Sequence, residues 1–512
     1  MTQPTPPPAE PAGRLNILVL GEGGTFASPS RPQSHPQDVD DLFAQLRAQA
    51  AAHLVIYFHG GLTAEQDGLT QANQLMPFFG DRLGAYPLFF LWETGGGDIV
   101  AGTLQQIGQE PLFVRLRDIV IQFTLGKLQA PSATRDLSPP PGPDAVAQET
   151  ARDRVAPDAP AVGGRPTLAP VDAVDAAQLQ AHLQADPAYQ AAVAQVQASL
   201  APPADGTRDL LPTPAPAPPT LLSQDVQDAL RAEDAAGTRD LGGGSLFLAG
   251  QAVAIFGRTV ARLQAGTDHG VYCTVVEELL RALYADKIGT AYWDAVKARA
   301  RDSFAPNDGL AGDALHGGRY LLERLAAYLA AADHPPLQVS LIGHSAGAIY
   351  VCHLLAAAHP LLPAGFQFAH VVFLAPAANL DLFTGTVLAH PEQIATFRMY
   401  ALADAVEARD ELAGPLYPRS LLYLVSGTFE AAPDTPLVGM ARYYSGQPPY
   451  DTPPLQAARA YLLATTPPRA VWAVTTDAAP GYGSSAHHHM GFVFDPATQD
   501  SLAVLLAGAA QS

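Results

Sequence analysis

Cysteine and positive charge are both scarce in this chain of 512 residues. It has 2 cysteines, and its 29 Lys and Arg face 49 Asp and Glu, which gives a net charge of −20 at pH 7. Two cysteines cannot build a disulfide framework and are too few for a structural zinc site. We therefore expect Cys273 and Cys352 to be small buried hydrophobic residues. A chain this acidic repels a phosphate backbone, so nucleic acid is not an expected partner.

Long apolar runs are missing as well. The longest such stretch, Leu246–Phe256, is too short to cross a bilayer, so we expect no transmembrane anchor. The first residues, MTQPTPPPAEPAGR, show neither the basic nor the apolar region of a secretory signal. By default we expect a soluble, cytoplasmic protein.

Proline is concentrated in one part of the chain. Residues 131–220 hold 17 of the 47 prolines and few large apolar side chains, which does not favour an ordered sheet. We therefore predict a disordered tail at 1–13 and a Pro/Ala-rich linker at 129–244. Within the linker, Val171–Leu200 is compatible with a marginal helix.

The predicted linker contains a short repeat. The tetrapeptide TRDL occurs three times, at residues 134–137, 207–210 and 238–241. The copies arise by chance or duplication, or they form a linear motif. The functional alternative is a docking motif or a cleavage site for an Arg-specific protease after Arg135, Arg208 and Arg239.

Outside the linker, apolar β-rich runs alternate with helical patterns. Strands buried on both faces are nearly continuous in hydrophobic residues, and helices between them indicate parallel crossovers. The sequence therefore predicts an α/β fold with a doubly wound, mostly parallel sheet. The expected strands are Leu15–Leu20, Leu54–Phe58, Tyr86–Trp92, Leu337–Ile342, His370–Leu374, Thr396–Ala401 and Ala470–Thr475. The expected helices include Thr274–Tyr284, Gly317–Ala332 and Ala346–Ala358, whereas Ser420–Phe429 suits either a strand or a buried helix. The core is expected in two parts, 14–128 and 335–512, separated by the linker and by a helical segment at 245–334.

The pentapeptide Gly343-His344-Ser345-Ala346-Gly347 carries the clearest chemical signal. It lies between an expected strand and an expected helix, the context that a G-x-S-x-G nucleophile turn requires. There the serine Oγ is exposed, and the following helix N-terminus offers N–H groups to an oxyanion. The alternative is a glycine-rich turn in which Ser345 only caps the helix.

A second glycine turn, His59-Gly60-Gly61, ends the strand at Leu54–Phe58. Such a turn can direct backbone N–H groups into a nucleophile pocket. We expect Gly60 or Gly61 and Ala346 to supply the oxyanion hole. The alternative is a glycine turn that takes no part in binding. Trp92, at the end of another expected strand, either shapes the pocket or simply packs in the core.

A serine nucleophile needs a histidine base and an orienting carboxylate, which follow it in the order acid, then histidine. The triplet His487-His488-His489 comes after the last expected strand. We favour His489, because Gly491 and Phe492 follow it as a turn and an anchor; His487 and His488 stay as alternatives. For the acid we favour Asp404, just past the strand Thr396–Ala401. Glu430 is the main alternative, followed by Asp410 and Asp381.

These features together resemble the α/β-hydrolase superfamily, and in particular a bacterial lipase- or esterase-like branch. The resemblance rests on HGGL at 59–62, WETG at 92–95, GHSAG at 343–347 and HMGF at 489–492. It covers about 14–128 and 246–512, and it implies an α/β-hydrolase fold. The separation between the Trp92 strand and the nucleophile strand is far longer than the superfamily norm, so we expect the linker and the helices of 246–334 to interrupt the core and to form a lid. Met490 stands where a glycine is expected.

From these residues we expect a serine hydrolase that cleaves carboxylic esters through an acyl-enzyme on Ser345, without metal or organic cofactor. We expect the substrate to be a small-molecule or lipid-like ester. The helical segments Pro111–Leu128 and Ser245–Leu263 are apolar enough to cover a hydrophobic acyl pocket, which favours lipid-like or medium-chain esters. The alternatives are another acyl-transfer enzyme (peptidase, thioesterase or acyltransferase) and a non-catalytic scaffold on the same fold.

Overall fold

The computed structural model describes residues 13–28, 33–61, 65–92, 97–129, 168–201, 219–236, 245–288, 290–411, 416–475 and 478–507. The chain forms two compact units. The sheet unit comprises Met1–Asp98, Tyr292–Glu407 and Pro436–Ser512, and the helical unit comprises Ile99–Ala291 and Ala408–Thr435. The three TRDL repeats, with Arg135, Arg208 and Arg239, lie outside the described residues.

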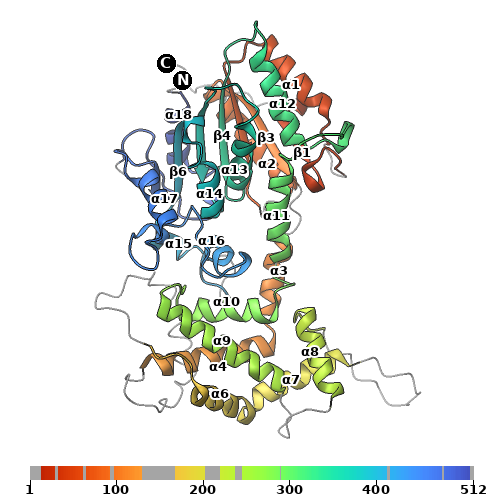
Figure 1. The fold of residues 1–512 in the computed structure, drawn as a ribbon, viewed down its shortest axis with the longest axis vertical. Coiled ribbons are helices and arrows are strands. Elements are labelled where there is room, and N and C mark those ends of the chain that lie inside the picture. Colours follow the sequence, from red (N-terminus) through yellow and green to blue (C-terminus); the bar gives the residue numbers. More distant parts are fainter. Residues whose placement is uncertain are drawn as a thin grey trace, which may run out of the picture. The chain divides into compact units, whose positions relative to one another are not determined.

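Seven parallel strands form the sheet (Figure 1). Their order is β1-β3-β2-β4-β5-β6-β7. The expected α/β architecture with a mostly parallel sheet is therefore confirmed, and each expected strand is present. Their bounds are β1 Ile17–Leu20, β2 His53–Phe58, β3 Tyr86–Trp92, β4 Gln338–His344, β5 Phe368–Leu374, β6 Ile394–Leu402 and β7 Ala470–Ala473.

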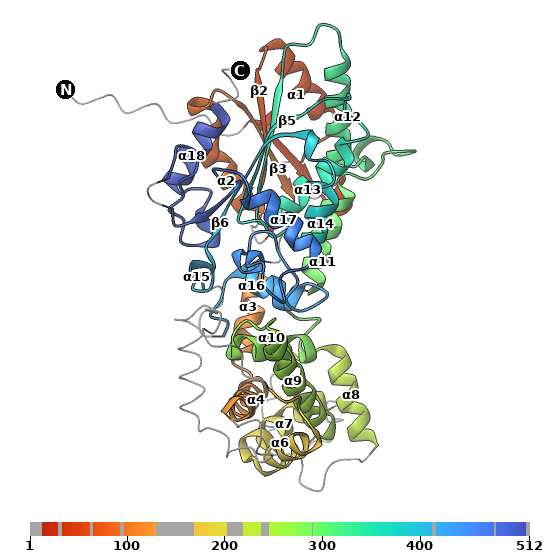
Figure 2. The ribbon, with the colours of Figure 1, turned by 60° about the vertical axis from the view of Figure 1, so that its left-hand side comes forward.

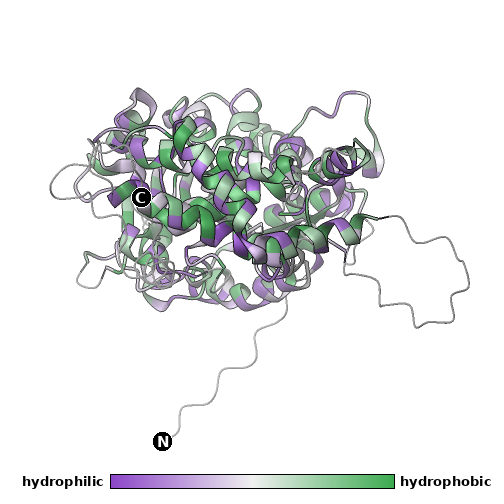
Figure 3. Ribbon diagram, turned by 90° about the horizontal axis from the view of Figure 1, so that it is seen from below, coloured by the Kyte–Doolittle hydropathy of each residue, from purple (hydrophilic) through white to green (hydrophobic). Residues whose placement is uncertain are grey.

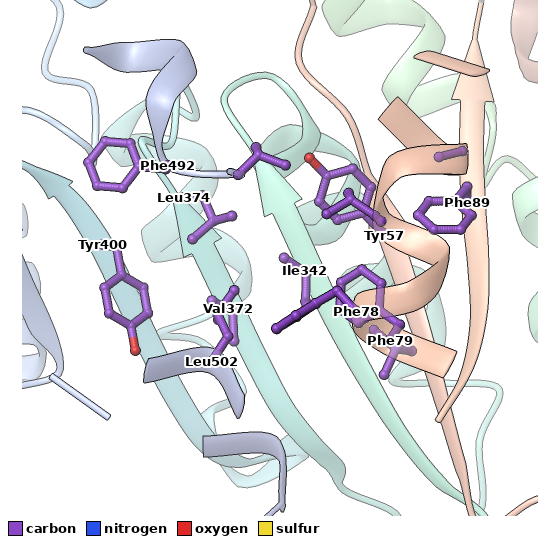
Figure 4. Close-up of a cluster of buried hydrophobic side chains, with 14 of the residues drawn as sticks. Tyr57, Phe78, Phe79, Phe89, Ile342, Val372, Leu374, Tyr400, Phe492 and Leu502 are labelled. Atoms are coloured by element: carbon purple, nitrogen blue, oxygen red, sulfur yellow. The ribbon is translucent and has the colours of Figure 1, made fainter. Parts of the chain in front are cut away.

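Helices cover both faces of the sheet, which explains why its strands are apolar throughout. On one face, α2 (Glu65–Met76), η3 (Pro77–Arg82) and α18 (Pro496–Ala507) contribute to a cluster around Tyr57, Ile342 and Val372 (Figure 4). On the other face, α13 (Gly347–Ala358) places the Tyr350 ring against Phe58. There α14 (Leu380–Thr386) packs through Phe383 against Phe373.

The strand order reverses between β2 and β4. The chain runs from β2 outwards to β3, whereas β4 pairs with the other side of β2, with Phe58 beside Gly343. In open α/β sheets, ligands bind beyond the carboxyl ends of the strands at such a switch point. The turns that leave β2 and β4 are the two glycine motifs at 59–61 and 343–347.

The other helices of the sheet unit pack around this framework. Helices α1 (Pro36–Ala48) and α12 (Gly317–Ala330) lie side by side (Figures 1 and 2). Helix α11 (Thr290–Asp302) precedes α12, while α15 (Asp404–Glu407) and α17 (Pro453–Leu463) follow β6.

The helical unit is built on α4 (Pro111–Gln129), α9 (Leu246–Ala265) and α10 (Val271–Leu283), which contact one another, with α3 (Gly97–Ile107) leading into it. Part of the range 129–244 also folds: α6 (Ala173–Ala185), α7 (Pro187–Leu200) and α8 (Gln224–Ala235) are helices there. The marginal helix expected at 171–200 is two helices, because Asp186 ends α6 and caps α7, and Pro187 follows it. Ion pairs Lys127–Asp175 and Arg115–Asp186 attach them to α4.

Helix α9 is long and apolar enough to cross a membrane, the only such helix in the described part of the chain. It extends the apolar stretch that we expected to end at Phe256. Two of its arginines, Arg258 and Arg262, make ion pairs with Glu278 of α10. The buried core helices of soluble proteins can have the same length and composition. Figure 3 shows hydrophilic and hydrophobic residues mixed along the helices rather than separated between them.

A buried charge network holds the segment 408–435 in the helical unit. His269 is fully buried, with Nδ1 2.7 Å from Glu277 Oε1 and Nε2 3.1 Å from Asp434 Oδ1. Glu277 also accepts a hydrogen bond from Tyr417 (2.6 Å) and pairs with Arg262. The ambiguous stretch Ser420–Phe429 is helical and buried, as α16 (Leu421–Leu424) and the π-helical turn η6 (Val425–Phe429).

Candidate active site

Ser345 stands in a strained turn between β4 and α13. Its φ is 53°, a left-handed conformation that only glycine adopts easily. The flanking glycines permit this turn. A Cβ on Gly343 would lie 2.7 Å from the Gly347 carbonyl carbon, and a Cβ on Gly347 would lie 2.3 Å from the Phe58 oxygen. Gly343 is therefore required by the close approach within the turn, and Gly347 by the contact of the turn with β2.

The turn after β2 lies directly against the serine turn. A Cβ on Gly60 would lie 3.4 Å from Ser345 Cβ, and one on Gly61 would lie 2.9 Å from Ala346 Cβ. Ala346 is the N-cap residue of α13, so its amide belongs to the first turn, where N–H groups lack partners within the helix. The three residues expected to form the oxyanion hole are thus adjacent.

The His59 side chain fixes the peptide between Gly60 and Gly61. His59 Nδ1 donates to the Gly60 oxygen (2.7 Å), while its Nε2 accepts from the Trp92 amide (3.3 Å). Burial lowers the pKa of His59 to about 4, so the ring is neutral and holds one tautomer. Because C=O and N–H point in opposite directions across a trans peptide, the Gly61 N–H faces away from His59.

Trp92 is a core residue. Its ring is fully buried, stacked between His59 (3.8 Å between centroids) and Tyr350 (4.0 Å). It supports the Gly60–Gly61 turn through His59. Residues 93–95 of the WETG segment lie outside the described residues.

His489 is the histidine of the triplet that meets the serine. Its Nε2 lies 2.9 Å from Ser345 Oγ, across 144 residues of sequence. It lies in η8 (His489–Gly491), beyond β7. His487 and His488 are exposed, whereas His489 is only 3% exposed. The structure therefore forms a serine–histidine pair at the switch point of the sheet.

Burial controls the charge of this pair. It lowers the pKa of His489 to about 3, with the neighbouring His344 ring lowering it further. The imidazole is therefore neutral at pH 7 and able to accept a proton. So low a pKa makes a weak base, and a carboxylate beside Nδ1 is the usual means of raising it.

Asp404, the expected orienting acid, lies just past β6. It begins α15, two residues beyond the end of β6, where the Ala403 amide bonds to the Ala473 oxygen of β7. The role of Asp404 stays a prediction. Asp381 is exposed in the first turn of α14. Glu430 and Asp410 belong to the helical unit.

Two contacts at the site escaped the sequence interpretation. Tyr292 of α11 donates a hydrogen bond from its hydroxyl to the Gly61 oxygen, although 231 residues separate them. His344, the residue before the nucleophile, donates from Nε2 to the main-chain oxygen of His489 (3.1 Å). Nothing in the sequence pointed to Tyr292, whereas His344 lay inside the motif itself.

One group of side chains in the described ranges has the composition of a metal site. His359, His390 and Glu392 place their ligand atoms within 4.8 Å of one another on the surface of the sheet unit. His359 directly follows the last residue of α13, at the opposite end of that helix from Ser345. The group is therefore separate from the serine–histidine pair.

Comparisons with protein-family models, with curated proteins and with solved structures gave no match. A function has to be argued from the geometry of the site itself.

Proposed function

We propose that this protein is a serine hydrolase that cleaves carboxylic esters through an acyl-enzyme on Ser345. The observation that carries the proposal is the hydrogen bond between Ser345 and His489, at a serine held in a left-handed conformation. Strain of this kind is unfavourable for folding and persists mainly at functional sites. It is a feature that the α/β-hydrolase fold, implied by the sequence resemblance, would explain.

The proposed reaction has two steps. Ser345 Oγ attacks the ester carbonyl while His489 Nε2 takes its proton; the same nitrogen then protonates the leaving alcohol. Water attacks the acyl-enzyme in the second step and releases the acid. The oxyanion receives hydrogen bonds from the amide of Ala346 and from the Gly60–Gly61 turn. Asp404 is proposed to hold the His489 tautomer and to raise its basicity.

Little of the serine–histidine pair faces solvent, since Ser345 and His489 are each 3% exposed. We propose that the helical segment at 245–334 forms a lid over the site, and that the linker with the TRDL repeats controls it.

The proposal is tested by hydrolysis of nitrophenyl esters of increasing chain length. We expect turnover by the wild type, no turnover by Ser345→Ala, and a preference for medium or long acyl chains. A maximum at acetate would contradict the lipid-like substrate but not the hydrolase. Full activity of Ser345→Ala would contradict the nucleophile.

A choice of substrates distinguishes ester hydrolysis from the other acyl-transfer reactions. Matched amide, thioester and ester substrates with the same acyl group distinguish a peptidase or thioesterase from an esterase, and added alcohol distinguishes an acyltransferase. If none of them turns over and no acyl-enzyme forms, the scaffold alternative takes precedence.

A further inference from the structure

The ring of His344 touches each part of the proposed catalytic site. Its Nε2 bonds to the His489 main-chain oxygen, and its centroid lies 5.5 Å from that of the His489 ring. Its Nδ1 lies 3.2 Å from the point that a Cβ on Gly60 would occupy. His344 is also the residue immediately before Ser345. One fully buried side chain therefore lies among the base, the oxyanion turn and the nucleophile.

The hydrogen bond assigns the protonation of this ring. A main-chain oxygen only accepts, so Nε2 carries the proton. Burial lowers the pKa of His344 to about 4, which keeps the ring neutral and leaves Nδ1 without a proton. Nδ1 is buried and has no hydrogen-bond partner among the described residues. The ring accordingly offers a single donor, and that donor is directed at His489.

The hydrogen bond from His344 reaches a short element of the chain. His489 begins a three-residue 3-10 helix, and the residues on either side, His488 and Met490, are exposed. Phe492, which is fully buried, anchors the far end of this short element. The bond from His344 holds the near end, at the same residue whose Nε2 meets Ser345.

We propose that His344 is a positioning residue: its Nε2–H holds the main chain of His489 so that the base meets Ser345, while its other edge sets the distance to Gly60. This inference rests on the proposed hydrolase function. It assigns His344 no contact with the substrate. We call the hydrogen bond from His344 Nε2 to the His489 main-chain oxygen the tether. Its loss is expected to slow acylation without weakening substrate binding.

Two substitutions separate the tether from simple packing. His344→Leu keeps a side chain of similar bulk without a donor. His344→Gln places an amide N–H near the position of Nε2. Wild type and both variants are compared in fluorophosphonate inactivation rate, in kcat and KM for a nitrophenyl ester, and in thermal stability.

We expect His344→Leu to lower kcat and the inactivation rate by about tenfold or more, with KM within about twofold, because small misplacements of a catalytic group are costly. His344→Gln should recover most of the loss. Equal rates for wild type and His344→Leu, or equal losses in both variants, would overturn the inference.

A second readout does not depend on activity. In protein with isotope-labelled histidine, NMR reports the His489 ring directly. We expect its signals to be sharp in the wild type and in His344→Gln, and to broaden or shift in His344→Leu; an unchanged His489 ring in His344→Leu would contradict the tether. If the folded wild type neither reacts with fluorophosphonate nor turns over an ester, the proposed function fails, and this comparison still decides the role of His344.

Discussion

Ser345 Oγ and His489 Nε2 lie 2.9 Å apart at the carboxyl edge of a seven-stranded parallel sheet. The serine follows β4 and the histidine lies beyond β7, so the pair joins two segments that are far apart in the sequence. The structure gives this pair a neutral imidazole, a strained serine and two adjacent glycine turns.

The strain at Ser345 should be measurable as stability. Ser345→Gly and Ser345→Ala both remove Oγ, but only glycine relieves the positive φ. We expect Ser345→Gly to be more stable than Ser345→Ala by about 1 kcal/mol, as measured by urea unfolding. Ala50, with φ 46° just after α1, is a matched control: Ala50→Gly should also stabilise while leaving Ser345 reactive. Equal stability of the two Ser345 variants would contradict the strain.

Gly61 should tolerate no side chain. A Cβ there would lie 2.9 Å from Ala346 Cβ and 3.6 Å from Val296, so Gly61→Ala has to push the two oxyanion turns apart. We expect the fluorophosphonate inactivation rate to fall by about a hundredfold, the usual cost of losing one oxyanion donor. Gly80→Ala, where a Cβ meets nothing within 4 Å, is the control and should react at the wild-type rate.

Acid should destabilise the sheet unit through its buried histidines. Burial lowers the pKa of His53, His59, His344, His353 and His370 to about 4, against 6.5 when unfolded. Between these values the unfolded chain binds more protons, so stability is complete above about pH 6.5 and is lost as the pH falls towards 4. Urea midpoints at pH 7.5, 6 and 5 should decrease in that order.

His370 gives this prediction a single-residue test. Both its ring nitrogens are buried without hydrogen-bond partners among the described residues, and it faces His53 at 6.3 Å between centroids. We expect His370→Leu to raise stability at pH 7 by about 1–3 kcal/mol and to reduce the acid sensitivity. The control His53→Leu removes the bond to Ser340 (2.8 Å) and should not stabilise. A destabilised His370→Leu would show that the imidazole is needed there.

The fold was largely predictable because its strands are buried on both faces. Runs such as LVIYF and YPLFFLW are apolar throughout, and the glycine and proline residues around them mark their ends. The helices within 129–244 were harder to predict from the sequence. Their alanine-rich faces bury little apolar area, so these helices are stable only when they pack against α4 and α9. The composition shows that this range is rich in proline, but it does not show the surface on which α6 and α7 pack.

The site was predictable where chemistry dictates local spacing. GHSAG and HGG have to be contiguous, whereas the choice of His489 among three adjacent histidines depended on the turn that follows it. Tyr292 and the tether from His344 arise from contacts between distant segments, which no local pattern encodes.

The charge network of the helical unit should be essential to that unit. Burial by itself raises the pKa of Glu277, but the charges of His269 and Arg262 outweigh it and lower the pKa to about 2. Glu277→Gln removes the buried carboxylate that Arg262 and His269 share, so that they keep only Glu278 and Asp434, and we expect a loss of about 3 kcal/mol. Glu323→Gln, which removes a surface pair with Arg319, should cost about 0.5 kcal/mol or less in the same urea unfolding experiment. Similar losses for both would contradict the network.

The central claim is that Ser345 is a nucleophile activated by His489, and one labelling experiment tests it most directly. Wild type, His489→Gln and the double variant His487→Gln/His488→Gln are treated with a fluorophosphonate, and the labelled residue is found by mass spectrometry. We predict labelling of Ser345 in the wild type and in the double variant at similar rates, and a rate about a thousandfold lower in His489→Gln. A folded wild type that takes up no label, or a His489→Gln variant that reacts as fast as the wild type, would contradict the account.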